Sequence, residues 1–276
     1  MSGAMEKLGI EKYEVRGECL MVGSKGHTAV VLLDRPQVGN AFNTRMKAEL
    51  TRLWPELDTD PDIRVIVVGS TSERFFCTGR DVTEVAETGT ISSDVPFRRT
   101  GALTNRHAEI WTPVVCAVEG KTIGGGLHFV VDADIVVAGS TATFMDTHVN
   151  VGLVGALENL GVALKAGLGA ALYLTLLGRG AELSAAQAQQ LGLVQEVVEA
   201  GSALTRAMEL AEIIARNSPS AVSRSLEAIW GLATMGGYEQ ALQQGWLLLR
   251  RQWDHPDSKE GPRAWAERRE PRWSPR

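Results

Sequence analysis

The chain has 276 residues, of which 44% are hydrophobic and 22% charged, and its formal net charge is −5 at neutral pH. This length and apolar content suffice to bury a full core, in one large domain or in one domain with an appendage. The acidic balance, and the lack of Lys/Arg runs interleaved with aromatic residues, argue against a nucleic-acid partner.

The cysteine content and the hydropathy of the chain indicate the cellular compartment of the protein. Cys19, Cys77 and Cys116 are an odd number without paired spacing, which argues against a disulfide framework or a zinc site and fits a reducing compartment. No charged segment followed by an apolar one opens the chain, and no uninterrupted apolar window reaches about 18 residues. We therefore expect a cytoplasmic protein with no metal and no membrane partner.

The first third of the chain alternates apolar runs with turn signals. Residues 29–33 predict a strand, and the loop at 37–41 follows it. A helix should begin at Asn43 or Thr44, although Pro55 should kink it or end it early. Residues 63–68 predict another buried strand, because the run is continuously apolar.

A special turn follows this strand. The sequence Phe-Phe-Cys-Thr-Gly-Arg-Asp at 75–81 precedes a probable helix at 82–86, so backbone N–H groups are left unpaired at the joint. Residues 87–95 have little periodicity and predict a mobile loop beside the site. Residues 96–111 predict a helix.

A second special turn is glycine-rich and lies at 119–128. It joins a buried strand at 112–118 to a short helix at 129–132, and it contains Gly124, Gly125 and Gly126 in succession. Glycines at a strand-to-helix joint let bare N–H groups approach a ligand, where the helix dipole favours negative charge. The two turns together predict a site for an oxygen that becomes negative during a reaction.

Further strands and helices then close the core near residue 202, and the remainder is helical. We predict an α/β core over residues 1–202 and a helical region over 203–276. Five of the seven tryptophans lie at or beyond Trp230. The last helices carry an apolar stripe at Leu242, Trp246, Leu249 and Trp253, which favours self-association over docking onto the chain's own core.

Several ordered motifs resemble the crotonase (enoyl-CoA hydratase/isomerase) superfamily. They are Leu-Asp-Arg-Pro at 33–36, Gly-Asn-Ala-Phe-Asn at 39–43, Phe-Cys-Thr-Gly-Arg-Asp-Val at 76–82, the glycines at 120 and 124–126, Ala-Thr-Phe at 142–144, and the tail at 259–269. The resemblance covers nearly the whole chain, and ordered motifs at matching spacing are more specific than one glycine-rich loop.

The resemblance implies a spiral of ββα repeats, with a helical C-terminal region that makes a homotrimer or a dimer of trimers. It implies acyl-CoA substrates, a role in fatty-acid metabolism, and no cofactor other than the coenzyme A of the thioester. The thioester oxygen would be held by the backbone N–H groups of Arg80 and Gly125. The substrate-binding positions that it implies are Val38, Gly39, Asn40, Ala41, Asp81, Val82, Thr83, Gly124 and Gly126. Asp81 is expected to hold the turn, and the Arg80 side chain is expected to pair with Asp81 or Glu84.

The chain departs from the family at the two acid/base positions. Where family hydratases carry glutamates, this sequence has His128 and His148. Residue 128 lies one helical turn past Gly125, so its side chain can share the face that holds the thioester. Either histidine alone could be structural, but both together favour catalysis, because imidazole is the commonest general acid/base near neutral pH. Glu158 is interpreted mainly as a helix N-terminal charge, with an auxiliary catalytic role as the alternative.

Three functions remain open. The leading hypothesis is hydration or isomerisation of an unusual enoyl-CoA. Because burial lowers the pKa of histidine and favours the neutral base, the second is a C–C bond hydrolase that drives water onto a β-dicarbonyl substrate. The third is a non-catalytic acyl-CoA-binding subunit.

Overall fold

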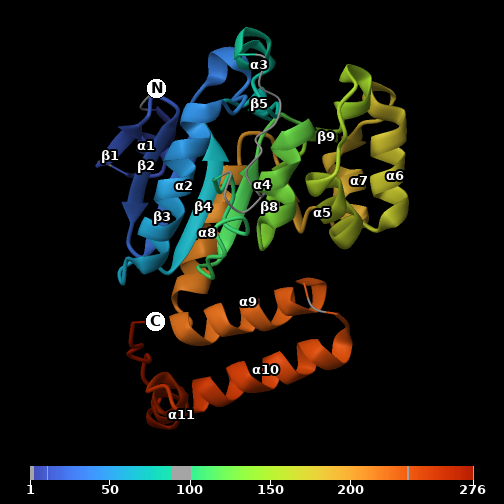
Figure 1. Cartoon of the computed structure of the whole chain (residues 1–276). Coiled ribbons are helices and arrows are strands. Elements are labelled where there is room, and N and C mark those ends of the chain that lie inside the picture. Colours follow the sequence, from blue (N-terminus) through green and yellow to red (C-terminus); the bar gives the residue numbers. More distant parts are fainter. Residues whose placement is uncertain (1–2, 11, 89–100, 235, 276) are drawn as a thin grey trace.

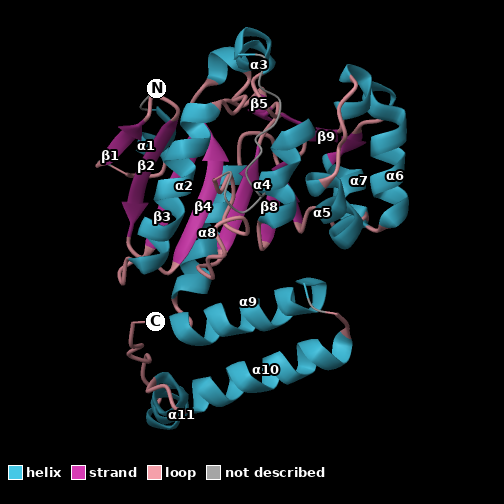
Figure 2. Ribbon diagram, viewed as in Figure 1, coloured by secondary structure: helices cyan, strands magenta, loops and turns pink. Residues whose placement is uncertain are grey.

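A computed structural model describes residues 3–10, 12–88, 101–234 and 236–275. Its centre is a seven-stranded sheet in the order β1-β2-β3-β4-β6-β8-β11, with helices on both sides (Figures 1 and 2). The strands from β3 to β11 pair in parallel, and β1 and β2 extend the sheet as an antiparallel edge. Their bounds are Tyr13–Arg16 (β1), Leu20–Lys25 (β2), Thr28–Leu33 (β3), Val65–Ser70 (β4), Val114–Val118 (β6), Ile135–Gly139 (β8) and Glu196–Val198 (β11).

A second, four-stranded sheet carries the turns that the sequence singled out. Its order is β10-β9-β7-β5, with bounds Leu183–Ser184 (β10), Thr143–Met145 (β9), Lys121–Ile123 (β7) and Phe75–Cys77 (β5). Strand β7 pairs in parallel with β5 and with β9. Because parallel neighbours end at the same edge, the turns after β5 and β7 leave the sheet side by side.

Eleven α-helices belong to the described part of the chain. They are α1 (Gly3–Lys7), α2 (Thr44–Thr59), α3 (Val82–Thr88), α4 (Leu127–Asp132), α5 (Leu157–Ala166), α6 (Leu168–Leu177), α7 (Ala185–Gln190), α8 (Ala203–Ala215), α9 (Pro219–Thr234), α10 (Tyr238–Trp253) and α11 (Asp257–Glu267). None of them is long and apolar enough to cross a membrane.

The large sheet is buried on both faces. Val31 and Leu33 of β3 pack into one hydrophobic cluster with α2, whereas Val30 and Leu32 pack into a second cluster with α8. Successive strand residues point to opposite faces, so a strand that is covered on both sides is continuously apolar. The predicted α/β core is confirmed, and α8, which the sequence grouped with the C-terminal helices, packs against this sheet.

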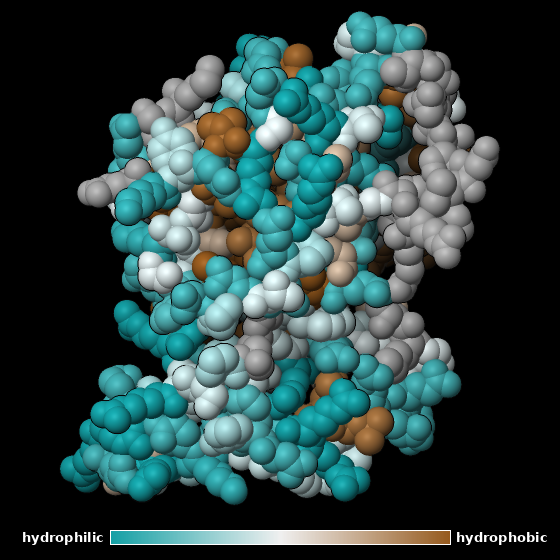
Figure 3. All heavy atoms as spheres, turned by 60° about the vertical axis from the view of Figure 1, so that its left-hand side comes forward, coloured by the Kyte–Doolittle hydropathy of each residue, from teal (hydrophilic) through white to brown (hydrophobic). Residues whose placement is uncertain are grey.

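Helices α9, α10 and α11 lie beside the core rather than on the sheet (Figure 1). Helices α9 and α10 pack against each other, and large apolar side chains such as Ile229 and Trp246 stay exposed on them. Figure 3 shows one face of the molecule, mostly hydrophilic, with hydrophobic patches that include one low on the molecule, where these helices lie.

The helix predicted at 96–111 was wrong, and of the two outcomes predicted at Pro55, a kink or an early end of the helix, the early end was wrong. Residues 101–111 form turns rather than a helix: Gly101 has a φ of 94°, and Thr104 and Asn105 donate hydrogen bonds to Asp132. Residues 96–100 of that predicted helix lie outside the described part. Helix α2 continues through Pro55 to Thr59, because its buried face (Met46, Leu50, Leu53, Trp54 and Leu57) holds it against the core. Of the predicted loop at 87–95, residues 87 and 88 belong to α3 and the rest is not described.

Candidate active site

The two turns that the sequence singled out are in direct contact. Gly79 has a φ of 87°, and a Cβ placed on it would lie 2.9 Å from the backbone nitrogen of Gly125. A Cβ on Gly126 would lie 2.3 Å from the carbonyl oxygen of Cys77. Only glycine fits such close backbone approaches. The turns after β5 and β7 therefore meet, as the sequence predicted.

The backbone around Arg80 leaves one N–H group without a protein acceptor. Phe42 and Arg80 form an isolated bridge, in which Phe42 N donates to Gly79 O at 2.8 Å and Asp81 N donates to Phe42 O at 3.0 Å. Within the described residues, the Arg80 N–H makes no such bond. The Arg80 N–H lies between the Gly79 carbonyl and the Asp81 N–H, both of which form hydrogen bonds with Phe42. Gly79 is also the glycine that contacts Gly125.

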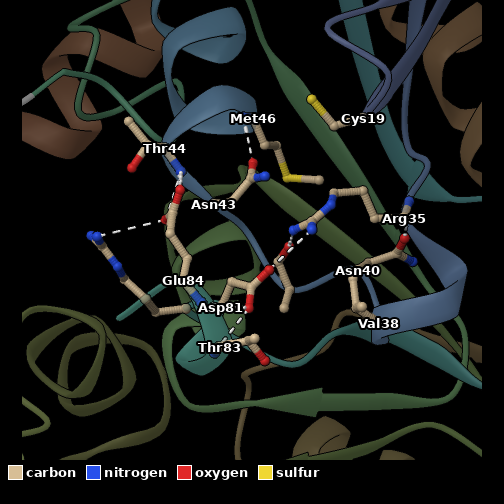
Figure 4. Close-up of polar contacts among 12 residues, drawn as sticks. Cys19, Arg35, Val38, Asn40, Asn43, Thr44, Met46, Asp81, Thr83 and Glu84 are labelled. Atoms are coloured by element: carbon tan, nitrogen blue, oxygen red, sulfur yellow. Dashed lines mark hydrogen bonds and ion pairs between the residues drawn. The ribbon is translucent and has the colours of Figure 1, made fainter. Parts of the chain in front are cut away.

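Asp81 holds the first turn, as expected. Its Oδ1 accepts a hydrogen bond from Thr83 N at 3.1 Å, and its Oδ2 lies 3.0 Å from the Arg35 guanidinium (Figure 4). Burial raises the pKa of this carboxyl, but the hydrogen bonds from Arg35 and from the backbone of Glu84 and Thr83, with the charge of Arg35, together outweigh burial, and the pKa falls below its ordinary value. The Arg80 side chain lies 3.9 Å from Glu84, one of its two predicted partners.

A groove of about 550 Å³ opens beside the turns. Five of the predicted substrate-binding residues line it: Val38, Ala41, Asp81, Val82 and Thr83. The cationic side chains of Arg80, Lys121 and Arg179 line it as well. The sequence did not single out Lys121 or Arg179.

The other four predicted binding residues, Gly39, Asn40, Gly124 and Gly126, are not among the residues that line the groove. Asn40 is fully buried, and its side chain accepts from Arg35 N and donates to Ser70 Oγ and to the Phe75 carbonyl. Gly39 has a φ of 64°. Gly124 and Gly126 are buried in the 3₁₀ turn that opens α4.

Glu158 joins the two predicted histidines. His128 projects from α4, His148 from the 3₁₀ turn after β9, and Glu158 from the first turn of α5. Nε2 of His128 lies 3.3 Å from Oε2 of Glu158, and Nδ1 of His148 lies 3.1 Å from Oε1. Glu158 is only 4% exposed. It is therefore both a charge at a helix N-terminus and the contact between the imidazoles.

Asp146 extends this cluster. Its Oδ1 lies 2.6 Å from Nδ1 of His148, and its Oδ2 accepts a hydrogen bond from Asn159 at 2.6 Å. The hydrogen bond to Asp146 raises the pKa of His148. Burial raises the pKa of Asp146 and of Glu158. The pKa of Asp146 is nevertheless lowered, by hydrogen bonds from His148 and Asn159 together with the charge of His148. The pKa of Glu158 is lowered by the hydrogen bond from His128 together with the charges of both imidazoles. The cluster favours ionised carboxylates beside a readily protonated imidazole.

His148 is the member of the cluster that faces the glycine-rich turn. A Cβ on Gly124 would lie 3.4 Å from Cε1 of His148, and the His148 side chain is 21% exposed, against 6% for Glu158. Both carboxylates approach its Nδ1 edge. Nε2 is therefore the ring nitrogen left for a ligand.

His107 is a histidine that the sequence did not single out. Its ring centroid lies 5.0 Å from that of His128, and its Nε2 lies 3.5 Å from Asp132. Burial lowers its pKa to about 4, so the ring is neutral at pH 7. No local pattern marks this residue, because the bonds from Thr104 and Asn105 to Asp132 bring it to the site.

In the described part of the chain, two sets of side chains have potential metal-ligand atoms close enough to surround a cation: His107, His128 and Asp132, and Asp146, His148 and Glu158. The 2.6 Å separation of His148 Nδ1 and Asp146 Oδ1 is that of a charge-assisted hydrogen bond. Two ligands of a tetrahedral zinc ion would be about 3.4 Å apart, at bond lengths of about 2.1 Å. This contact therefore matches a proton shared by the two side chains.

Comparison with known proteins identifies the family. The family model described as enoyl-CoA hydratase/isomerase matches residues 23–276. The chain belongs to this family. Proteins similar to this chain include an (E)-benzylidenesuccinyl-CoA hydratase from Thauera aromatica, 33% identical over 89% of this chain and 94% of that protein. Enoyl-CoA hydratase EchA19 from Mycobacterium tuberculosis is 33% identical over 94% of this chain and 98% of its own.

Solved structures of the same family share the fold. An enoyl-CoA hydratase/isomerase from Mycobacterium paratuberculosis superposes with a TM-score of 0.84 at 34% identity, covering 96% of this chain and 98% of the other. An enoyl-CoA hydratase from Mycobacterium tuberculosis gives a TM-score of 0.84 at 28% identity, covering 93% of this chain and 99% of that chain. The predicted crotonase fold with C-terminal helices is confirmed.

Proposed function

We propose that the protein adds water across the carbon–carbon double bond of an enoyl-CoA thioester. The observation that carries this proposal is Glu158, whose carboxylate contacts an imidazole at each oxygen, in a cluster that touches the glycine-rich turn through His148. Addition of water needs two proton transfers at neighbouring carbons, and the cluster supplies two acid/base groups. The hydratases among the relatives support this reaction class.

The thioester oxygen is held by the N–H groups of Arg80 and Gly125. Attack by water at C3 moves negative charge onto this oxygen, and each such donor contributes about 3 kcal/mol to stabilising the transition state. The contact between Gly79 and Gly125 supports the convergence of these two donors. The coenzyme A portion occupies the groove, where Arg80, Lys121 and Arg179 attract its phosphates.

His148 and the Glu158–His128 pair divide the proton transfers. The water oxygen bonds to C3 as one group removes a water proton, and the electron pair of the double bond moves towards the thioester oxygen. The other group then delivers a proton to C2, so the net change is the addition of one water molecule. Asp146 fixes the proton of His148 on Nδ1, which leaves Nε2 for the reaction.

Hydration of a panel of 2-enoyl-CoA thioesters tests the proposal. We expect turnover to 3-hydroxyacyl-CoA, and we expect His148→Gln to reduce kcat by about 10²- to 10⁴-fold. His27→Gln is the matched control, because His27 is exposed and its ring forms a hydrogen bond with the Asp62 carbonyl. The absence of turnover on every thioester, with coenzyme A binding intact, would contradict the proposal.

A second candidate is hydrolysis of a carbon–carbon bond in a β-dicarbonyl substrate. The observation that favours it is the Asp146–His148 pair, because a carboxylate that orients an imidazole is also the arrangement that activates water against a carbonyl. Release of a carboxylic acid from β-diketones or β-ketoacyl-CoA, with no hydration of enoyl-CoA, would favour carbon–carbon bond hydrolysis over enoyl-CoA hydration. A non-catalytic acyl-CoA-binding subunit would instead show no turnover in either assay.

Self-association is the remaining part of the proposal. Helices α5 and α6 expose Leu160, Leu164, Leu168, Leu172 and Leu176, and α10 exposes Leu242, Trp246, Leu249 and Trp253. Exposed apolar faces of this extent favour contact with another protein surface, and a homotrimer or a dimer of trimers would cover them.

A further inference from the structure

Two histidines and an aspartate form a second cluster, on the side of His128 that faces the turns at 101–111. His128 and Asp132 are four residues apart on α4, so their side chains share one face of this helix. His107 reaches the same face from the turns, and its ring packs edge to face against that of His128. One atom of each side chain, a ring nitrogen or a carboxylate oxygen, lies within 4.8 Å of the other two.

These side chains have the chemistry of a zinc site. Zinc takes imidazole nitrogens and carboxylate oxygens, and three protein ligands leave its fourth position open for water. Nε2 of His107 lies 3.5 Å from Oδ2 of Asp132, close to the separation of about 3.4 Å between two ligands of a tetrahedral zinc ion. Because no separation in the set exceeds 4.8 Å, the His128 nitrogen has to approach by at most about 1.4 Å to complete the site.

Neighbouring groups already orient two of the three ligands. Thr104 Oγ1 donates a hydrogen bond to Oδ2 of Asp132 at 2.6 Å, and the Asn105 side chain donates to the Asp132 carbonyl at 3.1 Å. Nε2 of His128 lies 3.3 Å from Oε2 of Glu158. Hydrogen bonds that fix the ligands in this way strengthen metal binding, and Glu158 adds a second negative charge beside the cation.

An ion can reach the cluster from solvent. The side chains of His107, His128 and Asp132 are between 11% and 17% exposed. Asp132 also lines a cavity of about 770 Å³, together with Glu109. Arg106 lies in the same wall, but it pairs with Asp134 at 2.5 Å, so its charge is compensated. The cavity therefore offers a cation a path that ends at a carboxylate.

We infer that His107, His128 and Asp132 bind one zinc ion, and that the bound ion inhibits the enzyme. A ring nitrogen of His128 that binds zinc uses its lone pair, so it accepts no proton while the ion stays bound. Cysteine spacing gives no sign of this site, because the set contains no cysteine. Zinc binding stands on the cluster alone, whereas the inhibition rests on the proposed acid/base function of His128.

Calorimetric titration of the whole protein with zinc chloride, without any thioester, tests the binding. We expect one ion per chain with an affinity in the micromolar range or tighter. His107→Gln should weaken it at least tenfold, because it removes one of three ligands. His27→Gln, which removes an exposed histidine away from the cluster, should change the affinity less than twofold. No saturable binding to the wild-type protein, or equal affinities in H107Q and the wild type, would overturn the inference.

Two further measurements locate the ion. Asp146→Asn removes a ligand from the other set of metal-ligand atoms, so we expect it to bind zinc as tightly as the wild type. In the wild-type protein, zinc should shift the imidazole NMR signals of His107 and His128 but not that of His255, and this result needs no folded variant. A shift of His148 without His107, or binding lost in D146N and kept in H107Q, would overturn the inference.

Hydration assays separate this inference from the proposed function. Saturating zinc should lower the kcat of the wild-type protein at least tenfold, a chelator should restore it, and H107Q should lose this sensitivity. Hydration that is unchanged by bound zinc would overturn the inhibition. Zinc binding that depends on His107, without hydration of any enoyl-CoA after chelation, would support the metal site and contradict the proposed reaction.

Discussion

Oε2 of Glu158 lies 3.3 Å from Nε2 of His128, while the other oxygen of the same carboxylate lies 3.1 Å from Nδ1 of His148. The three residues come from α4, from the turn after β9 and from α5, so the contact exists only in the folded chain. One buried carboxylate therefore contacts both of the histidines that we propose as acid/base groups.

Glu158→Gln tests the coupling. The amide keeps the shape of the side chain but removes its charge and its basicity, so we expect kcat to fall by about 10²- to 10⁴-fold with the fold intact. The measurement is steady-state hydration together with circular dichroism. Glu73→Gln is the control, because the Glu73 side chain is 77% exposed on the surface. Wild-type kcat in E158Q would remove Glu158 from the mechanism.

Asp146→Asn tests a positioning role. Because the hydrogen bond that His148 donates to Asp146 raises the pKa of His148, the loss of this bond should lower that pKa and move the corresponding limb of the kcat/KM profile to lower pH. The His148 imidazole resonance in an NMR titration should move in the same direction. If D146N lowers the rate without moving either titration, Asp146 has only a structural role.

The stability of the protein should depend on pH through the same groups. The pKa of His148 is raised above its ordinary 6.5, so its stabilising contribution is complete below pH 6.5 and is lost as pH rises through the folded value. The pKa of Glu158 is lowered from 4.5, so its contribution is present above pH 4.5 and is lost as pH falls through the folded value. The contribution of these groups to the free energy of unfolding should thus be largest between about pH 4.5 and 6.5.

Urea unfolding at pH 5.5 and pH 8 measures this dependence. The wild-type protein should lose stability between the two values, and His148→Gln should lose less. A loss of the same size in both proteins would show that His148 does not carry the effect.

Gly79→Ala tests the contact between the two turns. Its Cβ would lie 2.9 Å from the Gly125 nitrogen and displace the proposed oxyanion donors, so we expect kcat to fall by at least 10²-fold. Gly201→Ala is the matched control, because Gly201 has a φ of 83° but no atom within 4 Å of the added Cβ. Both variants carry a similar backbone strain of about 1 kcal/mol, so equal activities would contradict the proposed oxyanion site.

Trp246→Glu tests self-association. Trp246 is 53% exposed on α10 and packs edge to face on Trp253 with ring centroids 5.4 Å apart. A buried charge at a subunit contact should shift the protein towards monomer in light scattering. Trp265→Glu on α11, where the side chain is 85% exposed, should leave the mass unchanged. A monomeric wild-type protein would refute the proposed assembly.

The sequence predicted those parts of the site that follow from local patterns. The apolar runs predicted β3, β4 and β6, and the glycines at 79 and 124–126 predicted turns with close backbone contacts. Glu158 was assigned to a helix N-terminus, but its contact with two imidazoles depends on how α5 packs against α4. His107 could not be found in this way, because side-chain bonds to Asp132, 27 residues or more away in sequence, place its segment.

Incubation of the protein with a 2-enoyl-CoA in water labelled with heavy oxygen, followed by mass spectrometry, tests the central claim most directly. We predict 3-hydroxyacyl-CoA with one heavy oxygen at C3, formed by the wild-type protein and by E73Q and almost absent with E158Q. Unchanged thioester in every sample, or label found only in a released carboxylic acid, would contradict the account.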